Sequence, residues 1–143
     1  MIKELSLLDK ELYDKLGLEI NKNFINLFPL EKILDNNNEY IYGYYKDNNL
    51  IGFIHISKSY ETIDIINIIV KREERRNKIA TKLLDYVVDK YKDINNIMLE
   101  VRSKNDIAIK FYLNNKFKHI HTRENYYEDD DAYIMKRDVI WKI

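Results

Sequence analysis

A run of basic residues lies between a long apolar segment and an amphipathic one. The apolar segment covers Thr62–Val70, and the basic run is Lys71–Lys78. Main-chain amides at the start of a helix lack intrahelical partners and carry the positive end of the helix dipole, so they attract anions. Basic side chains add charge-assisted hydrogen bonds to phosphate. The pattern indicates a pyrophosphate site, although a solvated charged turn before a surface helix has the same composition.

Two further side chains are suited to proton chemistry. Glu100 lies within the apolar run Met98–Val101, where burial would make its carboxylate a stronger base. Tyr112 lies on the next predicted helix, and its phenol can donate a proton. Simpler interpretations stay open, because Glu100 could instead pair with Arg102 on the same strand face, and Tyr112 could instead pack beside Phe111.

Patterns for other kinds of chemistry are missing. The chain has no cysteine, which excludes disulfides, thiolate metal sites and a cysteine nucleophile. His55, His119 and His121 are scattered, so they predict no metal site. The acidic run Glu128–Asp131 lacks the alternating spacing of a calcium loop. We interpret it as a solvated turn, with weak attraction for a basic peptide as the second possibility.

The spacing of apolar residues predicts the elements that must position these groups. Residues 5–34 have helical spacing that is broken at Phe28-Pro29. The polar tetrapeptide Lys46–Asn49 suits a hairpin loop. We expect strands over 40–45, 50–57, 62–70, 96–101, 117–123 and 132–136, and helices over 77–91 and 105–114. This order predicts a mixed α/β sheet with helices packed on it.

Length and composition bound the class of protein. The 143 residues fit one domain, 1–143. Lysine plus arginine (24) equals aspartate plus glutamate (24), so net charge does not draw the chain to nucleic acid or membrane. No apolar run reaches the roughly 20 residues that span a bilayer, and the N-terminal residues form no signal peptide. We expect a cytoplasmic monomer or homodimer without nucleic-acid or membrane partners.

The segment Asn67–Leu84, NIIVKREERRNKIATKLL, resembles the acetyl-CoA-binding motif of the Gcn5-related N-acetyltransferase (GNAT) superfamily. In that family an Arg/Gln-x-x-Gly-x-Gly/Ala loop wraps the pyrophosphate. Arg75–Ala80 matches its first and last positions, and Lys78 replaces the first glycine. The resemblance implies that main-chain groups at the strand end pair with the pantetheine arm, and that the loop holds the pyrophosphate. The strand residues are Ile68, Ile69 and Val70, and the loop residues are Arg75, Arg76, Asn77, Lys78, Ile79, Ala80 and Thr81.

A second block resembles the same superfamily, specifically the bacterial ribosomal-protein-alanine N-acetyltransferases and related protein N-terminal acetyltransferases. Their pattern is Leu-Glu-Val-Arg, then Asn-x-x-Ala-Ile-x-x-Tyr, Gly-Phe and Arg-x-Asn-Tyr-Tyr. Lys116 stands in place of the glycine before the phenylalanine. The matching residues are Leu99–Arg102, Asn105, Ala108-Ile109, Tyr112, Phe117 and Arg123–Tyr127.

The resemblance implies the GNAT fold, a mixed and mostly antiparallel twisted sheet of about six or seven strands flanked by about four helices. It implies transfer of acetyl from acetyl-CoA to a primary amine without a metal. Glu100 would be the general base and Tyr112 the general acid. Asn105 would contact CoA and also cap its helix. A main-chain amide near Ile69 would stabilise the developing oxyanion.

The acceptor is suggested by Tyr126 and Tyr127, which we place in the loop between the last two strands. In the related N-terminal acetyltransferases this pair lines the peptide groove, although an ordinary aromatic strand end is the alternative. We therefore expect the acceptor to be the N-terminal α-amino group of a protein, such as a ribosomal protein. Two alternatives stay open. They are a small-molecule amine or lysine side chain, and a CoA-binding module without catalysis.

Overall fold

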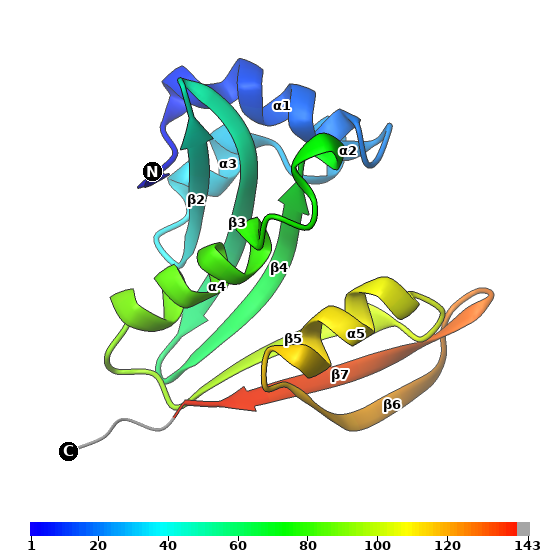
Figure 1. The fold of residues 1–143 in the computed structure, drawn as a ribbon. Helices are drawn as coiled ribbons and strands as arrows, with labels where there is room; N and C mark the ends of the chain where they lie inside the picture. The colour runs from blue at the N-terminus through cyan, green and yellow to red at the C-terminus, as the bar shows by residue number, and fades with distance from the viewer. Residues whose placement is uncertain (140–143) are drawn as a thin grey trace. The chain divides into compact units, whose positions relative to one another are not determined.

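The computed structural model describes residues 1–139. Seven strands follow the hydrogen-bonded order β1-β2-β3-β4-β5-β7-β6, which confirms the expected mixed, mostly antiparallel sheet with flanking helices (Figure 1). The elements are β1 (Ile2–Glu4), η1 (Leu7–Asp9), α1 (Lys10–Leu18), α2 (Phe24–Leu27), α3 (Leu30–Asp35), β2 (Glu39–Lys46), β3 (Asn49–Ser59), β4 (Thr62–Val70), η2 (Arg72–Glu74), α4 (Ile79–Lys90), β5 (Asn96–Arg102), α5 (Asp106–Asn114), β6 (Lys118–Tyr127) and β7 (Asp130–Asp138).

The N-terminal segment is more broken than its helical spacing suggested. It contains three short α-helices, with the expected break at Phe28-Pro29 between α2 and α3. Strand β1, which pairs with β2 in antiparallel register, was not expected. Its three residues are too few to show the two-residue period of a strand.

Contacts between residues divide the chain into two compact units. The first unit contains residues 1–57 and 66–91, and the second contains 58–65 and the residues from Lys92 onward. In the first unit, Tyr13, Phe24 and Phe53 pack ring against ring, with centroid separations of 4.9 to 6.0 Å. Gly17 is required beside them, since a Cβ there would lie 2.1 Å from the ring of Phe24. This aromatic core anchors the α-helices to the β2–β3 hairpin.

The β2–β3 hairpin lies where the sequence predicted it. Its turn residues Asp47 and Asn48 have φ angles of 51° and 67°. Positive φ at both central residues is the geometry of a type I′ turn, whose twist matches that of the flanking strands. Asparagine and aspartate tolerate this region better than most residues, so the polar tetrapeptide predicted the hairpin correctly.

In the second unit, β5 runs between two partners. It pairs in parallel with the first part of β4, from Thr62 to Ile65, and in antiparallel register with β7. The β6–β7 hairpin turns at 128–129, so both strands extend further than the spacing predicted. The buried side chains of this unit include Ile94, Ile97, Leu99, Val101, Phe117, Ala132 and Met135.

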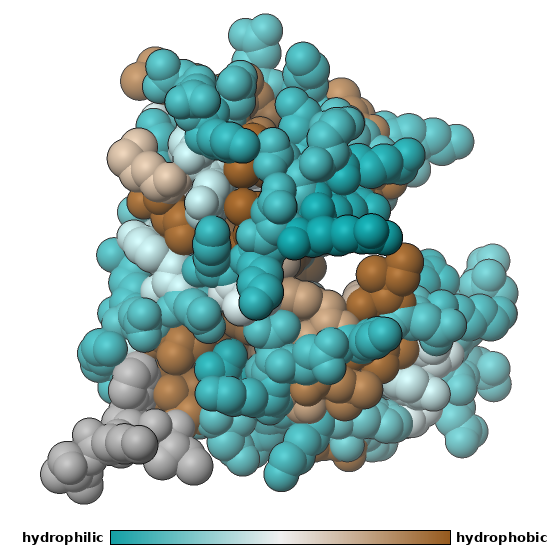
Figure 2. All heavy atoms as spheres, viewed as in Figure 1, coloured by the Kyte–Doolittle hydropathy of each residue, from teal (hydrophilic) through white to brown (hydrophobic). Residues whose placement is uncertain are grey.

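Polar side chains cover most of the face shown in Figure 2, where apolar residues form separate patches. None of the helices within residues 1–139 has both the length and the apolar character needed to cross a bilayer.

Candidate active site

The loop before α4 has the backbone geometry of a glycine-containing loop. Helix α4 begins at Ile79, two residues later than predicted, because Lys78 is a left-handed N-cap with φ 59° and ψ 26°. Arg76 also has a positive φ, of 75°. Left-handed backbone costs a residue with a Cβ about 1–2 kcal/mol. Lys78 therefore adopts the conformation for which the family pattern uses glycine.

The main-chain amides of this loop are available to a ligand. Within residues 1–139, the N–H groups from Arg76 to Thr81 donate no hydrogen bond to the protein. The first bond of the helix runs from the Lys82 N–H to the Lys78 carbonyl oxygen, at 3.0 Å. Successive amides at a helix start form an anion site.

The cations of the loop are available as well. The side chains of Arg75, Arg76 and Lys78 are exposed and, among the described residues, form no ion pair or hydrogen bond. Asn77 differs, because its Nδ2 donates to Oε2 of Glu74 at 3.2 Å. Free amides and unpaired cations in one loop fit the pyrophosphate of CoA.

The end of β4 offers a further set of main-chain groups. The ladder between β4 and β5 ends at Ile65, so the groups of 66–70 take no part in it. On the β3 side, Gly52 allows a close approach, since a Cβ there would lie 3.1 Å from the Ile69 carbonyl oxygen. Ile69 is buried, while Ile68 and Val70 are half-buried. The main-chain role predicted for these three residues is compatible with this arrangement.

Glu100 does not lie in the apolar surroundings that the sequence suggested. Its neighbours Leu99 and Val101 are buried, but Glu100 lies on the opposite, exposed face of β5. Its carboxylate pairs with Arg123 rather than Arg102, at 3.3 Å from Nη1 to Oε1. The prediction of a buried base was wrong because side chains alternate between faces along a strand.

Tyr127 contacts the other oxygen of the same carboxylate. Its hydroxyl donates to Oε2 of Glu100 at 3.4 Å. Partial burial, and then the negative charge of Glu100, raises the pKa of Tyr127. The Arg102 guanidinium lies over the Tyr127 ring, 3.9 Å from its centroid. The structure thus brings together two residues predicted for different roles, base and substrate contact.

Tyr112 lies in the last turn of helix α5, whose C-terminal cap fixes its position. Lys116 has a φ of 72°, and the Phe117 N–H donates to the Tyr112 carbonyl oxygen at 3.0 Å. The two rings also contact, with centroids 5.3 Å apart. This arrangement is a Schellman motif, in which a left-handed residue ends the helix and an apolar pair covers it. Lys116 occupies the left-handed position, which explains the glycine of the family pattern.

The Tyr112 side chain is buried, and burial raises the pKa of its phenol to about 12. It therefore stays protonated at neutral pH. Its ring also contacts Phe111, as the simpler interpretation predicted, at 5.2 Å between centroids. Among the described residues, no hydrogen bond or ring contact joins Tyr112 to Glu100.

Asn105 is the N-cap of α5, as predicted. Its Oδ1 accepts from the Ala108 N–H at 3.1 Å. The residues before it are fixed by Asp130, which is buried and accepts from the Ser103 hydroxyl and, at 3.0 Å, from the Lys104 N–H. This anchor was not predicted, because Asp130 stands in an acidic run that resembles an ordinary solvated turn.

Tyr126 and Tyr127 lie at the end of β6 and not in the loop between the strands. Their rings meet edge to face at 5.3 Å, and Tyr126 is 54% exposed. The acids that follow are mostly engaged by the protein. Asp129 pairs with Arg102 at 3.3 Å, and Asp131 accepts from the Asn125 N–H at 2.8 Å. The acidic run is therefore a turn in which Asp129 and Asp131 contact other residues of the protein.

His55, one of the three histidines in the sequence, has a partner within the protein. His55 is buried and lies 2.8 Å from Oε1 of Glu39. Across residues 1–139, no cluster of three His, Cys, Asp or Glu side chains is placed to hold a metal.

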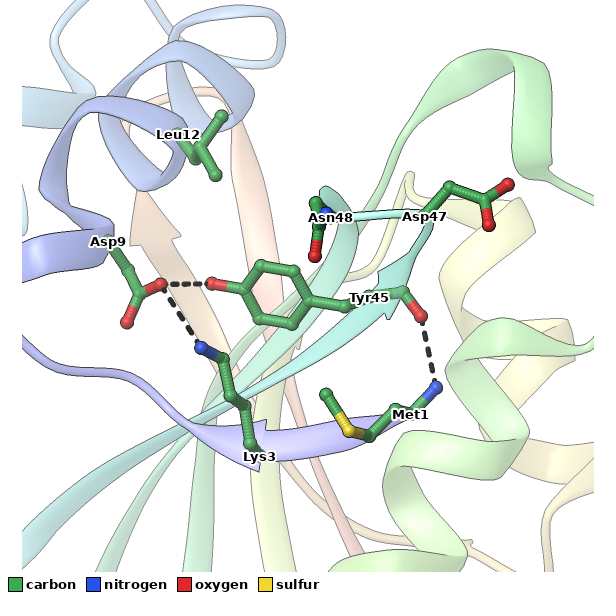
Figure 3. Close-up of a pocket in the computed structure, with 7 residues that line it drawn as sticks. All are labelled: Met1, Lys3, Asp9, Leu12, Tyr45, Asp47 and Asn48. Carbon is green, nitrogen blue, oxygen red and sulfur yellow. Dashed lines mark hydrogen bonds and ion pairs between the residues drawn. The ribbon is translucent and has the colours of Figure 1, made fainter.

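A hollow of about 330 Å³ is lined by none of the predicted site residues (Figure 3). At its wall, Asp9 accepts from the Tyr45 hydroxyl at 2.5 Å and lies 3.7 Å from Nζ of Lys3. The lining residues are Met1, Lys3, Asp9, Leu12, Tyr45, Asp47 and Asn48.

Residues 7–117 match the model of the Acetyltransferase (GNAT) family, so the chain belongs to that family. It is 35% identical over 107 residues to an N-alpha-acetyltransferase of Saccharolobus solfataricus, a match that covers 64% of each chain. The curated relatives are thus matched over less than two thirds of their length.

Solved structures share the fold. The ribosomal-protein-S18-alanine N-acetyltransferase of Escherichia coli superposes with a TM-score of 0.82 at 22% identity, covering 100% of this chain and 96% of that one. The PaiA N-acetyltransferase of Thermoplasma acidophilum, solved with coenzyme A, gives a TM-score of 0.80 at 24% identity and covers 96% and 98%. These structures show that the fold is shared, and acetyl-CoA is the acetyl donor of the GNAT family to which the chain belongs.

Proposed function

We propose that this chain acetylates the N-terminal α-amino group of a protein, such as a ribosomal protein. The observation that carries the proposal is the Glu100 carboxylate on the exposed face of β5, with Tyr127 hydrogen-bonded to it and Tyr126 beside it. A carboxylate that an amine can reach, bordered by amphipathic rings, suits an amino terminus followed by a peptide backbone. The likeness to an N-alpha-acetyltransferase supports the same acceptor.

The loop before α4 would hold the cofactor. The free amides of 76–81 and the side chains of Arg75, Arg76 and Lys78 would bind the pyrophosphate, and the main chain of 68–70 would bind the pantetheine arm. Asn105 is a further cofactor contact by family resemblance. Acetyl-CoA supplies the acetyl group as a thioester, which only a neutral amine attacks.

Glu100 would generate that neutral amine. An α-amino group has a reference pKa of roughly 8, so it is largely protonated at neutral pH. The exposed carboxylate accepts the proton directly or through one water. The position of Glu100 on the exposed face of β5 suits this role, because the acceptor must reach the base from solvent.

Tyr112 would supply the second proton. Because burial raises the pKa of its phenol to about 12, it is protonated throughout the neutral range. It can donate to the sulfur that leaves, and it then recovers a proton readily. The Schellman motif fixes its position at the end of α5.

The experiment is a measurement of CoA release from acetyl-CoA with a panel of acceptors. The panel contains peptides with free Ala, Ser or Met termini, the same peptides with blocked termini and an internal lysine, and polyamines. We expect turnover with free-terminus peptides alone. Turnover with polyamines or with the blocked peptides would give a small-molecule amine or lysine as the acceptor. Binding of acetyl-CoA with no turnover on any acceptor would indicate a binding module.

A further inference from the structure

Arg123 is the cation that contacts the Glu100 carboxylate. The distance is 3.3 Å from Nη1 to Oε1, and the two side chains are 51% and 29% exposed. An incoming amino terminus carries the same charge as a guanidinium. The acceptor and Arg123 therefore compete for one oxygen of the carboxylate.

A bulge in β6 brings a second residue, Tyr127, to the same carboxylate. Arg123 is opposite Ala132 and Tyr127 is opposite Asp130, so β6 uses four residues where β7 uses two. Asn125, inside the bulge, has a φ of 52°. In a regular strand, residues four apart are separated by about 13 Å. The bulge shortens this separation, so Tyr127 as well as Arg123 contacts Glu100.

If Arg123 leaves Glu100, each of the two side chains still has another contact. Its guanidinium also lies 5.4 Å from the centroid of the exposed Tyr126 ring, where a cation is stabilised. The other oxygen of Glu100 keeps the hydrogen bond from Tyr127, at 3.4 Å. An exposed ion pair is weak, so exchanging one cation for another costs little.

Arg102 provides an internal comparison. It is 52% exposed and pairs with Asp129 at 3.3 Å. Its guanidinium lies over the Tyr127 ring, so it contacts the same aromatic pair without contacting Glu100. The two arginines thus match in charge and exposure, and they differ in whether they occupy the carboxylate.

We propose that Arg123 is a displaceable counter-ion of Glu100, whose place the ammonium of the acceptor takes on binding. Arg123 is a positioning residue that keeps the carboxylate oriented until the acceptor arrives. This inference rests on the proposed role of Glu100 as the base.

The test measures the Kd of an Ala-starting peptide by calorimetry, with CoA present, for the wild type, Arg123→Gln, Arg123→Lys and Arg102→Gln. Each protein is measured with the free-terminus peptide and with the same peptide acetylated at its terminus. Loss of the competing cation should tighten binding of the free peptide about two- to fivefold in Arg123→Gln. The acetylated peptide has no ammonium, so its Kd should not change. Arg123→Lys and Arg102→Gln should bind both peptides as the wild type does.

The kcat of Arg123→Gln shows whether the acceptor displaces Arg123 or whether Arg123 holds Glu100 in place during turnover. Since Arg123 has left the carboxylate when the acceptor is bound, kcat should equal that of the wild type. An unchanged Kd for the free peptide, a lowered kcat, or equal tightening of the acetylated peptide would overturn the inference. If the wild type turns over another amine and not this peptide, the proposed acceptor is wrong. The same comparison is then made with that amine, with the same outcomes.

Discussion

The loop before α4 and the Glu100 face of β5 differ in whether their polar groups have partners within the protein. In the loop, the amides from Arg76 to Thr81 have no protein partner within the described chain, and the cations beside them are unpaired. On β5, each oxygen of Glu100 already has a partner, Arg123 for one and Tyr127 for the other.

This difference indicates that the two regions affect different steps. Unpartnered donors lose only water when an anion binds, so the loop is prepared for its ligand. A carboxylate that already has a counter-ion must exchange it before it can receive an amine. Changes in the loop should therefore alter affinity for acetyl-CoA, whereas changes at Glu100 should alter turnover.

The largest effect should follow Glu100→Gln, which keeps the shape of the side chain and removes the base. General base catalysis contributes about 10²- to 10⁴-fold, and we expect kcat to fall by this amount. CoA affinity, measured by calorimetry, should stay at the wild-type value. Glu124→Gln, an exposed glutamate of β6, is the control and should be fully active. Wild-type turnover in Glu100→Gln would remove Glu100 from the mechanism.

Tyr112→Phe should lower kcat by about a hundredfold, the lower end of the range for a general acid. Because the acid must be protonated and its pKa is raised to about 12, Tyr112 should cause no loss of wild-type activity below about pH 11. The measurement is kcat against pH for both proteins. An alkaline decline near pH 9 that disappears in the variant, or unchanged turnover at neutral pH, would contradict the role of Tyr112.

Arg76→Gln should raise the KM for acetyl-CoA about tenfold, because a hydrogen bond to a charged group contributes about 1.5 kcal/mol or more. The value of kcat should change little, in contrast to the Glu100 variant. Arg72→Gln, an exposed arginine of η2, provides the matched control. Equal effects of the two arginine variants would show that general charge, and not the loop geometry, binds the cofactor.

The smallest effects should come from the two left-handed lysines. Lys116→Gly removes about 1–2 kcal/mol of backbone strain and adds about 0.5–1 kcal/mol of unfolded-state entropy. We expect a net gain of about 1 kcal/mol in the free energy of unfolding, seen as a higher urea midpoint at an unchanged m-value. Lys78→Gly should give a similar gain and, unlike Lys116→Gly, also weaken acetyl-CoA binding. A stability loss in either variant would argue against strain at that position.

Much of the fold was predictable because its signals are local. The apolar runs predicted β3, β4 and β5. The asparagine and aspartate of the hairpin loop predicted its turn, and Asn105 predicted the start of α5. The start of α4 was missed by two residues, since composition does not reveal that Lys78 has a positive φ.

The site was predicted less well, because its contacts join separate elements. Alternation along β5 should have shown that Glu100 faces away from Leu99 and Val101. The contact of Glu100 with Tyr127 depends on the bulge in β6, which has no sequence signal beyond Asn125, a residue that tolerates positive φ. Motif spacing supplied the candidate residues, whereas their contacts required the structure.

The most direct test of N-terminal acetylation by Glu100 uses one peptide that carries both a free alanine terminus and an internal lysine. The peptide is incubated with the protein and acetyl-CoA, and tandem mass spectrometry then locates the added acetyl group. We expect acetyl on the terminal nitrogen alone, and no acetylated peptide at matched times with Glu100→Gln. Acetyl on the lysine side chain, or equal terminal acetylation by the Glu100 variant, would contradict it.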